Sequence, residues 1–222
     1  MVHAVFEKVT REKISDEAAL EFFRTEVSKQ PIEMREKELM LERGAADLSK
    51  SLAKFGPILR ASGAAAEVDF YSSHLEINGA PITGKIDHIN INKETREIEL
   101  YDFKTSRFHK EKWDSNDTLY KYKLQLGFYK LLLNLSPEYA KYKVTRAHIL
   151  FVSPDNFNEV HDKIYEFNEK DEAELSALIT AVYREIKTLD FVDNPGLFIE
   201  ADSKKGLKDI KEFVKLLIDG DK

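Results

Sequence analysis

Apolar residues recur at helical spacing near the start of the chain. The stretch "VHAVFEKV" places its apolar side chains on one face of a helix, as expected for a helix that packs on a core. That face comprises Val2, Val5, Phe6 and Val9. A second helix is predicted to begin at Ser15 or Asp16, because both side chains suit a helix N-cap.

The helical pattern continues over residues 34–55. A break is expected near Gly44, and the Gly-Pro pair at 56–57 is expected to end this part of the chain. Residues 1–60 are therefore predicted to form a helical N-terminal part.

Between residues 65 and 104 the apolar period shortens to two, which is typical of half-buried strands. Turn residues in "NGAP" and "NKETR" separate the apolar runs and indicate reversals of the chain. The pattern predicts three strands, over residues 66–77, 80–91 and 96–104.

The second half of the chain mixes both periods. A helix is predicted over residues 117–135, with a core stripe of Tyr120, Leu124, Phe128, Leu131 and Leu135. Strands are predicted at 143–153 and 159–167, and helices at 171–189 and 207–218, the last ended by Gly220. The final helix is expected to pack on the domain through Leu207, Ile210, Val214 and Leu217. The fold class is therefore α/β, with a mixed central β-sheet flanked by α-helices.

Composition narrows the function classes. The chain has 222 residues, 42% hydrophobic and 33% charged, which suits a soluble globular protein. It has no cysteine, so cysteine-based zinc and iron–sulfur sites are excluded from it. No apolar run is long enough for a membrane helix, and a cytoplasmic protein without a membrane partner is expected. The net charge of −6 is unusual for a protein that binds nucleic acid unaided.

The strand pattern brings two carboxylates together. If residues 80–91 and 96–104 form a hairpin that pairs Ile91 with Ile98, then Asp87 lies opposite Asp102, on the same face as the apolar residues. Two carboxylates at the distance of a cross-strand pair repel by about 4 kcal/mol at an effective dielectric of about 20. Something must offset this repulsion.

Three offsets are open: one carboxylate is protonated, Lys104 neutralises one charge, or a divalent cation bridges the pair. The simplest alternative is a salt bridge between Asp102 and Lys104. On the following helix, Gln125 and Tyr129 are four residues apart and share a face. His88, next to Asp87, is expected on the opposite face in a structural role.

Three segments in order resemble the RecB-like branch of the PD-(D/E)xK nuclease superfamily: "ITGKIDHI" (82–89), "ELYDFKTS" (99–106) and "LQLGFYKLLL" (124–133). This branch is found as the C-terminal nuclease domain of UvrD/AddA-type helicases. "MVHAVFEKV" resembles the latter half of the upstream motif of the branch, with His3 at its histidine. The glycine of that motif is absent, and His88 stands where Arg is frequent.

The resemblance implies a restriction-endonuclease-like fold and a set of roles. Asp87, Asp102, the backbone carbonyl of Phe103 and His3 would hold Mg²⁺ or Mn²⁺. Lys104 would position and activate the attacking water. The last two residues of the site, Gln125 and Tyr129, would contact the bound DNA strand or hold Lys104 in position.

The expected function is metal-dependent DNA cleavage, on single-stranded DNA delivered by a helicase motor that is fused upstream or bound in a complex, in DNA repair or recombination. The chain is expected to be one domain over 1–222, excised from a larger helicase-nuclease: a helical part (1–60), a catalytic sheet and helix (65–152) and a closing strand and helices (153–222). Two alternatives stay open: a non-cleaving DNA-binding or assembly module, and a restriction-type or junction-resolving endonuclease. Residues 104–123 form a basic, aromatic-rich stretch, interpreted either as a strand-binding loop or as a flexible charged loop.

Overall fold

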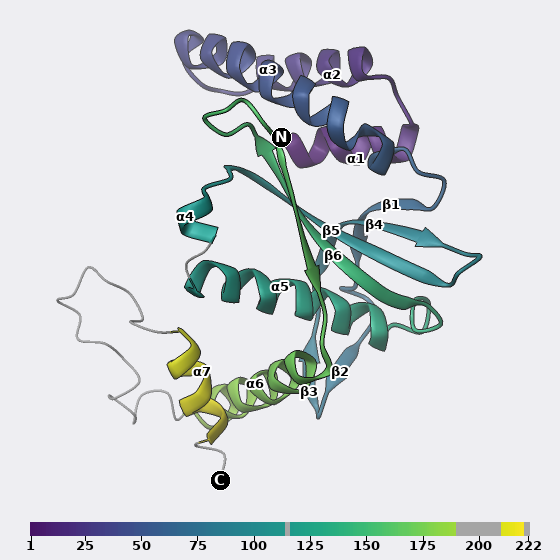
Figure 1. The fold of residues 1–222 in the computed structure, drawn as a ribbon, viewed down its shortest axis with the longest axis vertical. Coiled ribbons are helices and arrows are strands. Elements are labelled where there is room, and N and C mark those ends of the chain that lie inside the picture. Colours follow the sequence, from purple (N-terminus) through teal and green to yellow (C-terminus); the bar gives the residue numbers. More distant parts are fainter. Residues whose placement is uncertain (114–115, 190–209, 220–222) are drawn as a thin grey trace, which may run out of the picture.

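The computed structural model describes residues 1–113, 116–189 and 210–219. Its N-terminal part is a layer of three helices at one end of the molecule (Figure 1). These are α1 (Val2–Glu12), α2 (Asp16–Ser28) and α3 (Met34–Leu59). The predicted cap of the second helix is confirmed, because the Ser15 hydroxyl accepts a hydrogen bond from the Ala18 amide.

A five-stranded mixed sheet lies beneath this layer, in the order β1-β4-β5-β6-β7. Its neighbours are antiparallel except for β5 and β6, which run parallel. The strands are β1 (Ala64–Asp69), β4 (Lys85–Asn92), β5 (Glu97–Arg107), β6 (Lys143–Ser153) and β7 (His161–Glu166). The predicted class, a mixed sheet with flanking helices and a helical N-terminal part, is confirmed.

The two predicted strands nearest the N-terminus are each divided in the structure. The first is split into β1 and β2 (Leu75–Ile77), and the second into β3 (Ala80–Ile82) and β4. Among the described strands, β2 and β3 pair only with each other, as a separate two-stranded sheet. The Phe70 amide donates a hydrogen bond to the Gly84 carbonyl. The break after β1 and the break before β4 are therefore joined by this bond.

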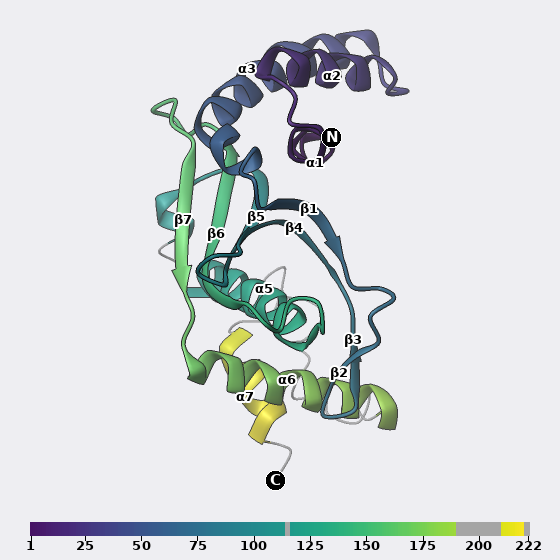
Figure 2. The same cartoon turned by 90° about the vertical axis from the view of Figure 1, so that its right-hand side faces the viewer.

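The remaining helices lie on the other side of the sheet: α4 (Lys110–Trp113), α5 (Asn116–Leu135), α6 (Glu169–Thr188) and α7 (Ile210–Asp219). Helix α5 packs on the sheet, and α6 and α7 pack on α5 (Figure 2). One apolar core lies between the sheet and α5 and includes Ile89, Leu100 and Leu132. A second core lies between the sheet and the N-terminal helices and includes Phe6 and Phe103. None of the described helices combines the length and apolar character needed to cross a bilayer.

Two expectations about helix ends were wrong. α3 runs without a break through Gly44, where an added Cβ would lie 2.6 Å from Cζ of Phe23. The glycine therefore allows α2 and α3 to pack closely. Pro57 lies inside the last turn of α3, which continues to Leu59.

The predicted core stripe of α5 was only partly correct. Tyr120 and Leu131 are buried, but Leu135 is 40% exposed, and Leu124 and Phe128 are half-buried. The buried positions that were missed are Leu126, Tyr129, Leu132 and Leu133. In α7, Val214 and Leu217 are buried as predicted, while Leu207, Gly220 and the side chain of Ile210 lie outside the described residues.

Candidate active site

The predicted register of the β4–β5 hairpin is confirmed, because Ile89 pairs with Leu100 and Ile91 pairs with Ile98. The backbone pairing ends at His88 with Tyr101, and one further step in the same register would set Asp87 opposite Asp102. Asp87 Oδ2 accepts a hydrogen bond of 2.9 Å from the backbone amide of Phe103. The Asp87 carboxylate is thus fixed to the neighbouring strand at Phe103, the residue that follows Asp102.

Asp102 is only 2% exposed. Its Oδ1 accepts a hydrogen bond of 2.9 Å from Nε2 of Gln125, and its Oδ2 lies 2.7 Å from Nζ of Lys104. Burial raises the pKa of Asp102, and the Lys104 ammonium opposes this rise. The lysine therefore favours the ionised form of a carboxylate that has been withdrawn from water.

Gln125 connects the lysine to the carboxylate and to a buried phenol. Its Oε1 accepts a hydrogen bond of 2.8 Å from Lys104 Nζ, and its Nε2 donates to the Tyr129 hydroxyl at 2.9 Å. Burial raises the pKa of Tyr129, so the phenol stays neutral. Because Gln125 and Tyr129 lie one turn apart on α5, a single helix face supplies both groups.

His3 approaches the site from α1, the first helix of the opposite layer. Its Nε2 lies 3.3 Å from Asp87 Oδ2, and its ring meets the edge of Phe103 with centroids 6.0 Å apart. Contact with Asp87 raises the pKa of His3. All of the sequence-predicted side chains are therefore linked: His3 to Asp87, and Asp102 to Lys104, Gln125 and Tyr129. Phe103 joins them through its amide, whereas the role expected for its carbonyl stays a prediction.

The donor set suits a hard divalent cation, which prefers carboxylate oxygens. Asp102 Oδ2 is buried and receives no hydrogen bond of acceptable geometry from the described residues, despite its ion pair with Lys104. A buried acceptor without a hydrogen bond is a candidate position for an unseen ion. In this conformation, however, no three His, Asp or Glu side chains of the described residues converge closely enough to hold a metal.

Two further features lie around this cluster. Glu67 has a φ of 53°, and it interrupts the β1–β4 pairing at the position that faces Asp87. Its carboxylate forms an ion pair with Lys85. Sequence reasoning missed a contact of Lys104, whose Nζ lies 5.2 Å from the ring centre of Tyr122; no pattern in the sequence predicts that pairing.

His88 points away from the cluster, as predicted from its position next to Asp87. It is fully buried, with Nδ1 3.4 Å from the Thr10 hydroxyl and Nε2 3.1 Å from Asn90 Oδ1. Burial lowers the pKa of His88 to about 4. The neutral imidazole of His88 joins the sheet to α1, and its role is therefore structural.

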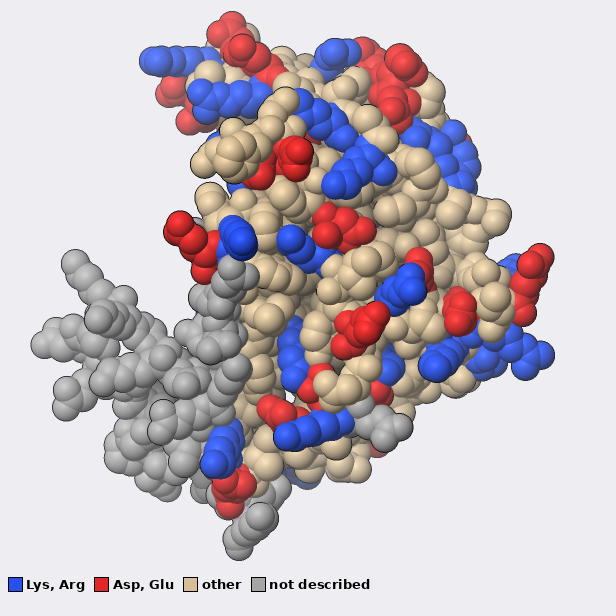
Figure 3. Space-filling view, viewed as in Figure 1, with Lys and Arg blue, Asp and Glu red and all other residues tan. Residues whose placement is uncertain are grey.

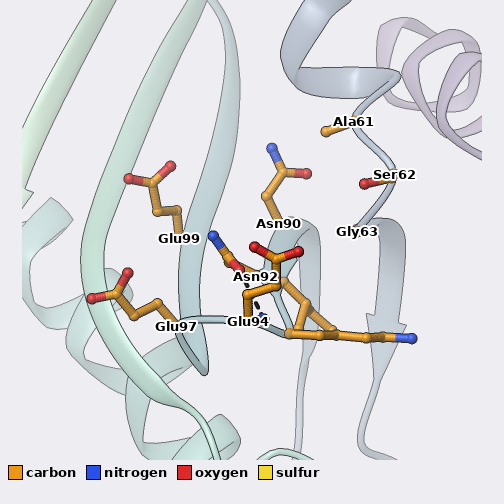
Figure 4. Close-up of a pocket in the computed structure, with 10 residues that line it drawn as sticks. Ala61, Ser62, Gly63, Asn90, Asn92, Glu94, Glu97 and Glu99 are labelled. Carbon is orange, nitrogen blue, oxygen red and sulfur yellow. Dashed lines mark hydrogen bonds between the residues drawn. The ribbon is translucent and has the colours of Figure 1, made fainter.

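A hollow of about 670 Å³ lies elsewhere, between the loop after α3 and the β4–β5 turn (Figure 4). Glu94, Glu97 and Glu99 line it beside Asn90 and Asn92. Three carboxylates with Lys93 as the one lining cation do not favour a phosphate. On the face shown in Figure 3, Lys and Arg are interspersed with Asp and Glu, without a large patch of one sign.

A mixed sheet covered by helices, in which an Asp on one strand meets an Asp-x-Lys on the next, is consistent with the restriction-endonuclease-like class of fold. The family model of the PD-(D/E)XK nuclease superfamily matches residues 1–198, and the chain belongs to this superfamily. Membership makes it a nuclease in general terms, of a superfamily that generally uses divalent metals and acts on DNA. No curated protein matches the chain significantly.

Proposed function

We propose that this chain is a Mg²⁺- or Mn²⁺-dependent deoxyribonuclease that hydrolyses single-stranded DNA as the nuclease part of a repair or recombination helicase. One observation carries the proposal: the ammonium of Lys104 is held between Asp102 and Gln125, beside the strand that presents Asp87. This arrangement places a fixed positive charge next to paired carboxylates, as hydrolysis of a phosphodiester requires.

Asp87 and Asp102 would hold the metal, with His3 and the Phe103 carbonyl completing its surroundings. A bound divalent ion supplies Lewis-acid stabilisation of the charge that develops on the phosphate. Lys104 contributes the ammonium that orients the attacking water and offsets negative charge. Gln125 accepts one lysine hydrogen bond and donates to Asp102, so it fixes both groups relative to each other.

The helicase context agrees with the charge of the chain. A net charge of −6 disfavours unaided capture of DNA, whereas a motor that delivers the strand removes this need. Single-stranded DNA is the form that such a motor releases. A non-cleaving module remains the competing proposal, against which the retention of Asp87, Asp102 and Lys104 argues.

The direct test is cleavage of end-labelled single-stranded and duplex DNA of the same sequence, with Mg²⁺, Mn²⁺ or EDTA. We expect metal-dependent cleavage that is faster on the single strand. The variants Asp102→Asn and Lys104→Ala should lose on the order of 100-fold or more in rate, with unchanged circular dichroism.

The control variant is His74→Asn, because His74 is exposed with a positive φ that Asn tolerates. It should cleave at the wild-type rate. Absence of cleavage with either metal, in an assay that detects a commercial nuclease at the same concentration, would support the non-cleaving module instead.

A further inference from the structure

Aromatic rings extend from Lys104 away from the carboxylates. Tyr122, which lies under the lysine ammonium, stacks on Trp113 with ring centroids 5.8 Å apart. Trp113 in turn meets the edge of Phe108 at 5.9 Å, and Phe151 packs against all three rings. The result is a continuous series of ring contacts that begins at Lys104. Phe108, Trp113 and Tyr122 are half-buried, and Phe151 is buried beneath them.

Two hollows lie along these rings. A narrow one of about 70 Å³ lies against Phe108, Trp113 and Tyr122, and a wider one of about 560 Å³ reaches Phe157 in the turn between β6 and β7. The two hollows share Arg107, Phe108 and His109. We call them together the aromatic groove.

Phe157 ends the groove with an exposed ring on a fixed turn. Its side chain is 86% exposed, although its amide is bound at 2.8 Å by Asp155 Oδ1. The same carboxylate accepts from the Glu159 amide and lies 2.9 Å from His161 Nε2. A ring that an ordered turn holds in place loses little entropy when it is covered. Its place at the end of the groove, beside the cations that line the groove, makes it a candidate for base stacking.

Cations accompany the rings. Arg107, His109 and Lys110 are exposed along the groove, and Lys163 Nζ lies 4.1 Å from the ring centre of Phe108. The acidic residues are Glu111 and Glu159 at the wall, and Asp155, which the turn itself engages. Alternating rings and cations match single-stranded nucleic acid, whose bases stack while its phosphates meet positive charge.

We infer that the aromatic groove binds single-stranded nucleic acid and leads the strand to Lys104. Of the two interpretations of residues 104–123, this selects the strand-binding surface and adds Phe157 from a distant part of the chain. The direction of the strand toward the lysine rests on the proposed function. Binding in the groove is a separate property, and it can be measured without cleavage.

Trp113 is the single tryptophan of the chain and lies in the groove, so its fluorescence reports on occupation. Oligo(dT) is titrated into the full chain in EDTA, where no metal supports cleavage. We expect saturable quenching of Trp113 fluorescence, together with a rise in the anisotropy of labelled oligo(dT) over the same concentration range. Affinity should fall with salt, because phosphate contacts release counterions.

Phe157→Ala should weaken binding about 5-fold or more, as expected for the loss of one base stack. Arg107→Gln should reduce the slope of log affinity against log salt by about 0.7. The matched control is Ile186→Ala on α6, which removes another exposed apolar side chain (54% exposed) and should bind as wild type.

Oligo(dT) that binds without quenching Trp113, or with equal affinity in Phe157→Ala, would place the strand elsewhere and overturn the inference. Failure to bind at all would also overturn it. Metal-dependent cleavage by the same preparation tests the proposed function independently: cleavage with an unoccupied groove refutes only the groove, and occupation without cleavage refutes only the nuclease.

Discussion

Gln125 fixes the positions of three site residues relative to one another, because its two polar atoms contact Asp102, Lys104 and Tyr129. Gln125→Leu would leave Asp102 without its hydrogen-bond donor, inside the protein. We expect a loss of about 1–3 kcal/mol in the free energy of unfolding, and a fall of about 10- to 100-fold in the cleavage rate. Urea unfolding and single-turnover cleavage measure the two effects.

Gln125→Glu separates charge from shape at this position. It keeps the acceptor for Lys104 but sets a second carboxylate against Asp102, and a like charge raises the pKa of its neighbour further. The acid limb of the pH–rate profile should therefore move to higher pH than in wild type. An unmoved limb would show that Asp102 does not titrate with activity.

The burial of His88 predicts that the free energy of unfolding depends on pH. Its pKa is about 4 in the folded chain and ordinarily 6.5, so the unfolded chain takes up the proton first as the pH falls. The contribution of neutral His88 to the free energy of unfolding is complete above pH 6.5. It is lost progressively between pH 6.5 and 4, to a total of about 3 kcal/mol.

The measurement is urea unfolding at pH 7.5 and pH 5. His88→Gln can still hydrogen-bond to Thr10 and Asn90 but cannot titrate, so its loss of stability over this interval should be about 2 kcal/mol smaller than that of wild type. His74→Asn, at an exposed position, should keep the wild-type pH dependence. Equal losses in His88→Gln and wild type would contradict the assignment of His88 as buried and neutral.

At the scale of elements, local patterns predicted the hairpin well. A strict period of two fixes which residues share a face, and the pairs Ile89–Leu100 and Ile91–Ile98 followed from it. The contacts among Asp102, Lys104, Gln125 and Tyr129 were predictable because they depend on this register and on one turn of α5, whereas the roles of these residues stay predictions. The contact between Lys104 and Tyr122 was not, because it depends on how α5 sits against β5.

Helix patterns were less informative where a helix touches several neighbours. α5 packs on the sheet and on α6, so it buries Leu126 and Leu133 outside the expected stripe. Gly44 suggested a break in the helix because it is a glycine. The structure shows instead that it makes room for Phe23 of another helix, a contact that the local sequence does not reveal. Glycine in a sequence indicates either flexibility or close approach, and only the tertiary structure distinguishes them.

The junction of α3 and β1 depends on such a close approach at Gly63. A Cβ at this position would lie 1.9 Å from the Ile91 carbonyl oxygen, and Gly63 accepts a hydrogen bond from the Ile91 amide. Gly63→Ala should lower the free energy of unfolding by at least about 2 kcal/mol.

Gly127→Ala is the comparison. A Cβ there would lie 3.0 Å from the tip of Leu175, and alanine favours the α5 helix by about 1 kcal/mol. Thermal unfolding should show a lower Tm for Gly63→Ala and a Tm near that of wild type for Gly127→Ala. Similar Tm values for the two variants would contradict the close approach at Gly63.

The whole molecule is organised around a sheet with a core on each face. Phe6 belongs to the core under the N-terminal helices, and Leu132 to the core under α5. Since β5 contributes to both cores, we propose that the described chain unfolds as one unit. Phe6→Ala and Leu132→Ala, each costing about 2–5 kcal/mol, should both shift a single transition that is coincident by near- and far-UV circular dichroism. Two separated transitions would indicate independent units.

Phe6→Ala, compared with His3→Ala, also tests how the layers assemble the site. Phe6 packs edge-on against Phe103, with centroids 4.8 Å apart, on the helix that carries His3. Loss of this ring should loosen α1 and separate His3 from Asp87, while Asp102, Lys104 and Gln125 stay linked from the other face. Under conditions where both variants are folded, Phe6→Ala should therefore behave like His3→Ala in Mn²⁺ titrations of cleavage, with a raised metal requirement and residual activity at saturation. An unchanged metal requirement in Phe6→Ala, alongside a raised one in His3→Ala, would show that packing of α1 on the sheet does not position the histidine.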